Sequence, residues 1–150
     1  MKTLQELQVL ILQWAKDKDL LKLENAPKQR LKLLEEVGET AGAILKNNHE
    51  GVKDGIGDIF VVLVILSEQL NKNIVFELTT KELTKFLVVD FNIGSIIHFS
   101  FDEDFINSFH SLVYTSNSLN LDLTECANLA WNEIKDRKGN TINGTFIKNN

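Results

Sequence analysis

Apolar and polar residues recur along most of this chain with the three-to-four residue spacing of amphipathic helices. Local signals agree with this spacing: Asp122 stands three residues before Glu125, as in a helix capping box, and Asn143 with Gly144 has turn chemistry. There is no internal repeat. The pattern predicts an all-α fold for a single domain, residues 1–150, arranged as a helical bundle of about six helices: 3–17, 27–46, 50–71, 80–89, 102–119 and 123–138.

One segment departs from the amphipathic spacing. Residues 59–66, IFVVLVIL, are rich in β-branched side chains and on their own would also fit a buried strand. The surrounding stretch 50–70 carries no turn signal, and about 20 residues are long for a strand but ordinary for a helix. A helix that is apolar on every side must be covered on every side. We therefore expect a homo-oligomer, a dimer or tetramer, with this helix at or near the interface.

Composition excludes several classes of partner. A net charge of −5 and a pI near 5.2 argue against a nucleic-acid polymer or a membrane surface as the partner. The single cysteine, Cys126, excludes an intramolecular disulfide and is typical of a small core residue. Residues 1–18 lack a signal-peptide cleavage site, and the apolar run 56–66 is far shorter than the roughly 20 residues of a membrane span. We expect a cytoplasmic protein.

Three acids fall on one face of the second predicted helix. Glu35, Glu36 and Glu39 span roughly 100° of the helical wheel, so their like charges repel one another. Either they form a solvated face, which Lys32 and Lys46 share, or they surround a bound cation. This helix alone leaves both interpretations open.

Asp58, on the next helix, favours the cation. Its face of the helix is apolar, with Val61, Val62 and Ile65 at i+3, i+4 and i+7, and Asp54 stands one turn earlier. An unpaired charge in apolar surroundings is strongly unfavourable unless a counter-charge accompanies it. The sequence therefore predicts a carboxylate metal site between the two helices that carry these acids.

The ligand types indicate the metal. Carboxylates without His or Cys suit Mg²⁺, with Mn²⁺ as the alternative. None of the three histidines, His49, His98 and His110, stands three residues after a Glu, which weighs against a di-iron carboxylate bundle. Mg²⁺ held by a few protein carboxylates usually also coordinates substrate phosphates. A nucleotide is therefore the expected ligand.

Glycines flank the acids on both helices. Gly38 and Gly42 lie beside the first acids, and Gly55 and Gly57 lie beside the second. Each glycine inside a helix costs about 1 kcal/mol relative to alanine. Close approach of two backbones, or of a ligand, explains such glycines, and the sequence does not separate these two explanations.

Two segments together resemble a known family. APKQRLKLLEEVGETAGAI followed by DGIGDIFVVLVIL is similar to the MazG-like, all-α nucleoside triphosphate pyrophosphohydrolases, and NEIKDRKGNTINGTFIK resembles the end of their short phage-type and bacterial members. The family pattern is E-x-x-E on one helix and E-x-x-D on the next. Glu36 and Glu39 match the first pair and Asp58 the last position, whereas Gly55 stands where the remaining Glu would be. Asp54 is the expected substitute ligand.

The resemblance implies metal-dependent hydrolysis of a (d)NTP at the α–β phosphoanhydride bond, which releases a (d)NMP and pyrophosphate. Glu36, Glu39, Asp58 and Asp54 would hold the metal, and Glu35 or Glu39 would orient or deprotonate the attacking water. The residues expected to bind the nucleoside triphosphate substrate are Asn132, Lys135, Arg137, Lys32 and Gln29.

Alternatives stay open at this point. The departure at Gly55 also fits a catalytically silent helical oligomer that binds a nucleotide or a protein partner. A phosphoribosyl-ATP pyrophosphohydrolase is a second alternative. Asn132 and Lys135 also fit an exposed helix end, where cations lie favourably near the negative end of the dipole. Trp14 and Trp131 fit core positions, and either one could instead stack on a base.

Overall fold

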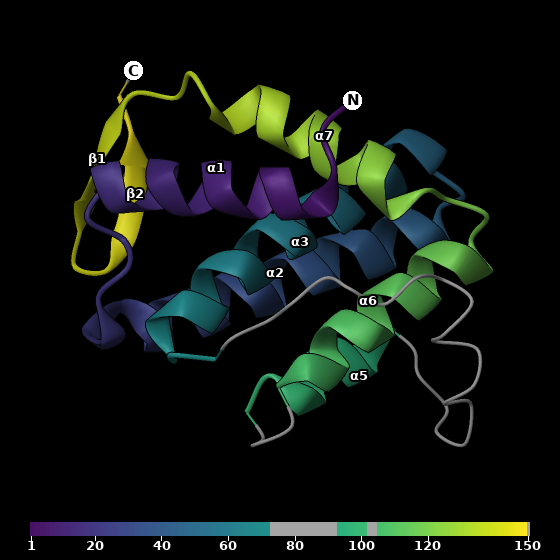
Figure 1. The fold of residues 1–150 in the computed structure, drawn as a ribbon. Coiled ribbons are helices and arrows are strands. Elements are labelled where there is room, and N and C mark those ends of the chain that lie inside the picture. Colours follow the sequence, from purple (N-terminus) through teal and green to yellow (C-terminus); the bar gives the residue numbers. More distant parts are fainter. Residues whose placement is uncertain (73–92, 102–104, 150) are drawn as a thin grey trace.

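The computed structural model describes residues 1–72, 93–101 and 105–149, and within them the chain is all-α with a small C-terminal β-hairpin (Figure 1). The predicted all-α fold is confirmed. The described elements are α1 (Leu4–Asp17), the short 3-10 helix η1 (Leu23–Asn25), α2 (Ala26–Leu45), α3 (His49–Gln69), α5 (Ile93–Phe99), α6 (Ile106–Ser118), α7 (Leu123–Ile134), β1 (Gly139–Ile142) and β2 (Thr145–Lys148).

Most of the predicted helices are present, with differences at their ends. The helix predicted at 80–89 lies outside the described residues, and α5 was not predicted. The helix predicted at 123–138 ends at Ile134, so extending it to Lys138 was wrong. Its start was right, because the Asp122 side chain accepts hydrogen bonds from the backbone N–H groups of Thr124 and Glu125 and so caps α7.

Helix α3 is the centre of the molecule. It contacts α1, α2, α6 and α7, and its side chains from Ile59 to Leu66 are all buried within one chain. The ambiguous segment 59–66 is therefore a helix, and its apolar surface is covered by the chain's own elements. The inference that a second copy must cover this helix was wrong, and the homo-oligomer itself stays a prediction.

Glycine lets α3 approach its neighbour α7 closely. A Cβ atom at Gly57 would lie 2.9 Å from the Ala130 Cβ and would collide with the Cys126 carbonyl oxygen.

Cys126 is itself buried, and burial raises the pKa of its thiol to about 11, so the thiol is protonated at neutral pH. Cys126 is a core residue, as predicted.

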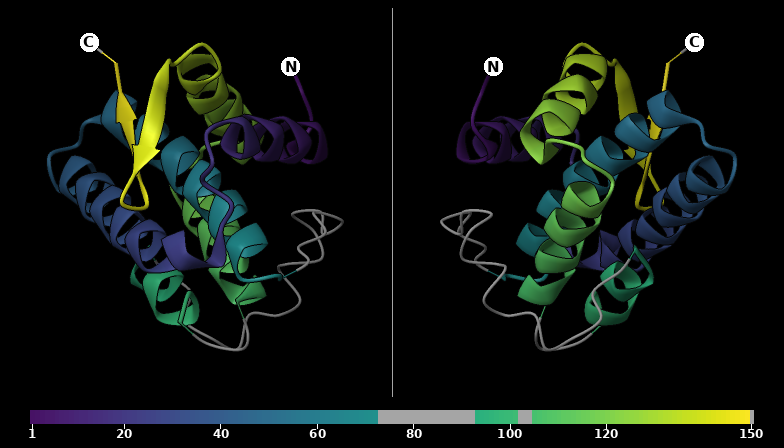
Figure 2. Two further views of the ribbon diagram at one scale, coloured as in Figure 1. Left: turned by 90° about the vertical axis from the view of Figure 1, so that its left-hand side faces the viewer. Right: turned by 90° about the vertical axis from the view of Figure 1, so that its right-hand side faces the viewer.

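The C-terminal hairpin was not predicted, although its turn was. Asn143 and Gly144 have φ angles of 49° and 79°, and both are positive as a type I′ turn requires. The hairpin is docked onto the helices at two points. The Thr141 hydroxyl donates a hydrogen bond to the backbone oxygen of Lys18, and Gly144 packs against Asn25 at the start of α2. Figure 2 shows the two strands lying beside α2 and the end of α1.

Candidate active site

Helices α2 and α3 run antiparallel and bring predicted site residues from both into one cavity. Two contacts fix their register: Thr40 packs against Gly55, and the Gln29 side-chain amide lies 3.5 Å from the Val62 carbonyl oxygen. The cavity has a volume of about 400 Å³. Among its lining residues are six of the predicted site residues: Gln29, Lys32, Glu36, Glu39, Asp58 and Arg137.

Asp58 is a half-buried carboxylate without a counter-ion in contact. Burial and the negative charges of Glu36 and Asp54 raise its pKa to about 7, while the charge of Arg137 acts in the opposite direction. Within the described residues, no hydrogen bond or ion pair involves its side chain. At neutral pH a cation near Asp58 would therefore offset both the cost of burying its charge and its repulsion by Glu36 and Asp54.

Glu36 is buried more deeply and does have a cationic partner. Its side chain is 7% exposed, and its Oε1 lies 2.7 Å from the Lys32 Nζ. The same ammonium lies 2.8 Å from Glu35 Oε2 on the outer side of the helix. Partial burial lowers the pKa of Lys32, but its hydrogen bonds with Glu35 and Glu36 outweigh that effect and leave the pKa raised. Lys32 is therefore charged and lies at the edge of the acidic part of the cavity.

The remaining predicted acids lie elsewhere. Glu35 and Asp54 line a second, more open hollow of about 610 Å³ beside Gly38. Glu39 borders both this hollow and the cavity. The structure thus brings Glu36, Glu39 and Asp58 together and places Glu35 and Asp54 on the other side of Glu39.

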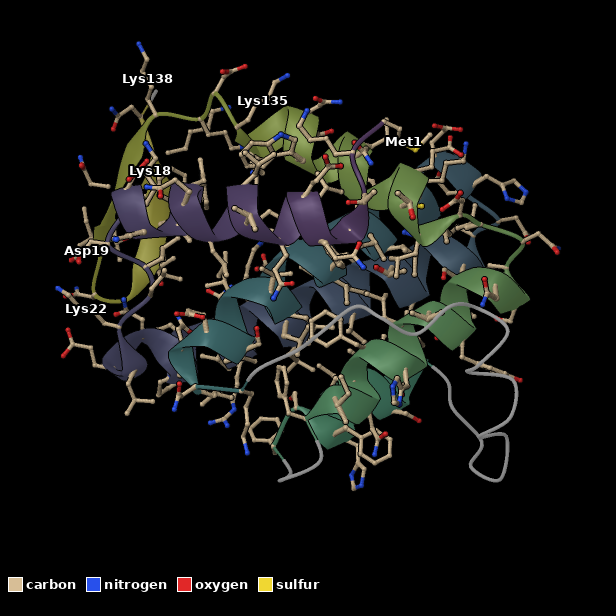
Figure 3. The ribbon with its side chains drawn as sticks, in the orientation of Figure 1. Met1, Lys18, Asp19, Lys22, Lys135 and Lys138 are labelled. Atoms are coloured by element: carbon tan, nitrogen blue, oxygen red, sulfur yellow. The ribbon has the colours of Figure 1, made fainter. Side chains whose placement is uncertain are left out.

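Two predicted substrate-binding residues do not line the cavity. Asn132 and Lys135 are exposed at the end of α7 and contact each other, with the Lys135 Nζ 3.0 Å from the Asn132 Oδ1. Lys135 points outward, as does Lys138 nearby (Figure 3). Arg137 is turned toward the cavity, and an ion pair with Glu133 at 3.2 Å holds its guanidinium.

The family that the acids indicate is also found by comparison. Residues 25–85 match the family model of the MazG nucleotide pyrophosphohydrolase domain. This part of the chain is similar to the MazG domain. The predicted resemblance and the all-α MazG-like fold are thereby confirmed, since this match includes the whole of α2 and α3.

A phage protein shares about half of the chain. An uncharacterized 18.2 kDa protein from the rep-hol intergenic region of Haemophilus phage HP1 (strain HP1c1) is 44% identical over 77 residues, which are 51% of this chain and 47% of the phage protein. The chain thus matches about half the length of this curated relative. No solved structure matches the chain.

The acids of the MazG-like domain suit a hard divalent cation by their chemistry. All three cavity acids offer carboxylate oxygens, the ligands that Mg²⁺ and Mn²⁺ prefer, and Asp58 has no ion-pair partner in the part of the chain that the structure describes. In the described residues no three His, Cys, Asp or Glu side chains converge closely enough to form a coordination cluster. The carboxylates are thus of the chemical type that Mg²⁺ and Mn²⁺ prefer, but the Glu36 carboxylate forms an ion pair with Lys32.

Of the residues that close the cavity on its other side, sequence reasoning considered only Trp14, as a core residue or as one that stacks on a base. Trp14 comes from α1, Lys28 from the first turn of α2, and Phe146 and Lys148 from β2. The Asn143-Gly144 turn was the only signal that a hairpin follows α7, and it does not say where a hairpin docks.

In the described residues, no helix is long and apolar enough to cross a membrane.

Proposed function

We propose that this cavity is the active site of a metal-dependent nucleotide pyrophosphohydrolase that cleaves a (d)NTP between its α and β phosphates. The match to the MazG nucleotide pyrophosphohydrolase domain supports the reaction class. The observation that supports the site is the presence of two opposite sets of charges in one cavity. Three carboxylates share it with four cationic side chains, Lys28, Lys32, Arg137 and Lys148.

Each set of charges has a role in this reaction. Glu36, Glu39 and Asp58 would hold Mg²⁺ or Mn²⁺, which supplies Lewis-acid activation and neutralises phosphate charge. The cationic side chains would bind phosphate oxygens, for which Lys and Arg are chemically suited. Asp54 remains a candidate ligand only if its side chain turns from the open hollow toward Asp58.

Glu39 is the better placed of the two proposed general bases. It borders the cavity, whereas Glu35 lines only the open hollow and is paired with Lys32. The hydroxyl of the attacking water goes to the α-phosphorus, and its proton goes to Glu39. The bond from the α-phosphorus to the bridging oxygen breaks, and this oxygen leaves with the electron pair as part of pyrophosphate. The products are a (d)NMP and pyrophosphate, and no covalent nucleophile is needed.

The experiment is an incubation of the purified protein with a panel of NTPs, dNTPs and phosphoribosyl-ATP, with Mg²⁺ or with Mn²⁺. Pyrophosphate and orthophosphate are measured separately. Pyrophosphate with an equal amount of the matching monophosphate is the expected result, with Asp58→Asn as the inactive control. Orthophosphate alone would mean that a different bond is cleaved and would overturn the proposal.

A second candidate, a nucleotide-binding protein without turnover, is favoured by one observation. A side chain at position 55, where the family pattern has Glu, would collide with Thr40. The packing of the two helices therefore excludes the carboxylate that the family pattern has there. Silence across the whole panel, together with nucleotide-dependent thermal stabilisation, would establish this candidate in place of the hydrolase.

A further inference from the structure

The cavity changes character along its length. On α3, Asp58 is followed on the same face by Val61, Val62 and Ile65, so seven residues of helix, about 10 Å, separate the acid from the last apolar residue. The antiparallel α2 changes in the same direction, from its acids through Lys32 to Gln29. One end of the cavity is therefore acidic, and the other end combines apolar side chains with the Gln29 amide and the Lys28 ammonium group.

Two aromatic rings reach the cavity from other elements, and the hairpin turn at Gly144, near Phe146, packs against Asn25 and Lys28 at the Gln29 end of α2. Trp14 of α1 and Phe146 of β2 both line the cavity, with their ring centroids 5.2 Å apart and an interplanar angle of 65°. Lys18 Nζ lies 5.9 Å from the centroid of the Phe146 ring. These rings come from the first helix and the last strand, and Figure 1 shows the C-terminal end of α1 lying beside the hairpin.

The position of the Phe146 ring is fixed by its own hairpin. Phe146 is half-buried, whereas its strand neighbours Thr145 and Ile147 are exposed, so the alternation of β2 turns Phe146 inward. Its ring lies against Gly139 of the paired strand, where a Cβ atom would be 2.7 Å from the Phe146 Cζ. Glycine at 139 therefore allows the ring to lie where it lines the cavity.

Gln29 supplies a polar group to the same cavity. It is 7% exposed, and its amide nitrogen has only the 3.5 Å contact with the Val62 carbonyl oxygen. Its amide oxygen accepts no hydrogen bond from the described residues. Apolar and aromatic side chains with a few convergent polar groups are the usual lining of a small-molecule site.

We propose that Trp14, Phe146 and Gln29 form a nucleobase subsite, in which the base lies against the aromatic rings and Gln29 hydrogen-bonds its edge. The inference rests on the proposed function for the other end of the ligand, since the triphosphate would lie at the acids and cations. Aromatic contact with a base is tolerant of its identity. Gln29 is therefore the specificity-determining residue of the three, because an amide reads the donors and acceptors of the base edge.

The test measures binding without turnover. Trp131→Phe leaves Trp14 as the one tryptophan of the chain, so quenching of its fluorescence reports a ring at this end. The probes are α,β-methylene nucleoside triphosphates of each base and inorganic tripolyphosphate, all with Mg²⁺, and calorimetry gives their affinities. We expect the nucleotide analogues to quench Trp14 and tripolyphosphate to bind without quenching.

Variants separate the base from the phosphates. Phe146→Ala should weaken the analogues at least tenfold and change the affinity for tripolyphosphate less than twofold. Phe146→Leu, which keeps an apolar side chain, should fold and show the same selective loss. Ile147→Ala is the matched control, because Ile147 is the exposed neighbour on the same strand and should change neither affinity. Gln29→Leu should reduce the difference in affinity between bases.

The failure of this inference and that of the proposed function give different results. Equal loss of analogue and tripolyphosphate affinity in both Phe146 variants, or no quenching of Trp14 by any analogue, would overturn the nucleobase subsite even if the protein hydrolyses NTPs. Quenching with selective loss in the Phe146 variants, without hydrolysis of any nucleotide, would establish the subsite and discard the hydrolase.

Discussion

The Thr40 side chain fills the space in which a side chain at Gly55 would lie. A Cβ atom at position 55 would be 3.0 Å from the Thr40 Cβ and would collide with its hydroxyl oxygen, which donates a hydrogen bond to the Glu36 carbonyl oxygen at 2.7 Å. Thr40 follows Glu39 directly, and Gly55 lies three residues before Asp58. The contact therefore sets the distance between the helices that carry the cavity acids.

Gly55→Ala should lower the stability of the protein by about 1–3 kcal/mol, the usual result of overpacking. Urea unfolding gives the free energy, and Thr40→Ala in the same chain should recover part of it because it removes the colliding hydroxyl. Strict additivity of the two substitutions would contradict the contact.

Gly38→Ala is the matched control for this prediction. Gly38 is in the same helix as Thr40, but a Cβ at Gly38 meets no atom of the described residues within 4 Å. Alanine there should stabilise the protein by about 0.5–1 kcal/mol, since it removes only the glycine penalty. Opposite changes in stability at Gly38 and Gly55 would distinguish a glycine needed for helix packing from one that contacts none of the described residues.

Asp58→Asn and Asp54→Asn should have unequal effects on turnover. Asp58 lines the cavity and has no partner among the described residues, so its loss should reduce kcat at least a hundredfold while the far-ultraviolet circular dichroism stays helical. Asp54 lines the open hollow, so its loss should cost less than tenfold. A loss at Asp54 as large as that at Asp58 would place Asp54 among the metal ligands.

Helices α2 and α3 could be predicted because residues within or next to each helix indicate where it begins and ends and which face carries the acids. Pro27 lies in the first turn of α2, and the break at Asn47 and Asn48 has a positive φ at Asn47. The apolar stripe around Asp58 also identified the acid that the structure leaves unpaired. Local pattern was sufficient because these features depend on residues within a turn or two of one another.

The other half of the cavity could not be predicted because it depends on contacts between distant segments. Thr141 and Lys18 are 123 residues apart, and their hydrogen bond is one of the contacts that dock the hairpin beside α1. Four-residue strands give too short an alternation to identify. Glu35 and Glu36 are adjacent on one helix, so the helical wheel did not show that Glu36 faces the cavity and that Glu35 lies outside it.

Lys32→Gln should destabilise the metal-free protein by about 1–2 kcal/mol, because it leaves the buried Glu36 carboxylate without its cation. Added Mg²⁺ should then raise the melting temperature of the variant more than that of the wild type, since the freed carboxylate is available to the metal. Lys22→Gln is the control, because Lys22 pairs with Asp19 at an exposed site away from the cavity acids. Equal effects of Mg²⁺ on the wild type and the Lys32 variant would contradict this role for Lys32.

The stability of the metal-free protein should fall as pH rises from about 4 to about 7. The pKa of Asp58 is 3.8 in an ordinary environment and about 7 in the fold, so between these values the folded state binds a proton that the unfolded state has released. The contribution is full below the lower value and is lost as pH rises through the upper one. After allowance for solvent screening of this half-buried group, we expect about 1–2 kcal/mol in urea unfolding with EDTA present.

Two variants isolate Asp58 from the other titrating groups. Asp58→Asn carries no charge at any pH, so its stability should vary less over this interval and exceed that of the wild type at pH 8. Asp54→Asn removes one of the negative charges that raise the Asp58 pKa, so the fall in stability should end at a lower pH. A wild type and an Asp58→Asn variant with parallel stability curves from pH 4 to pH 8 would show that Asp58 titrates as an ordinary surface acid, and the case for a cation beside it would then fail.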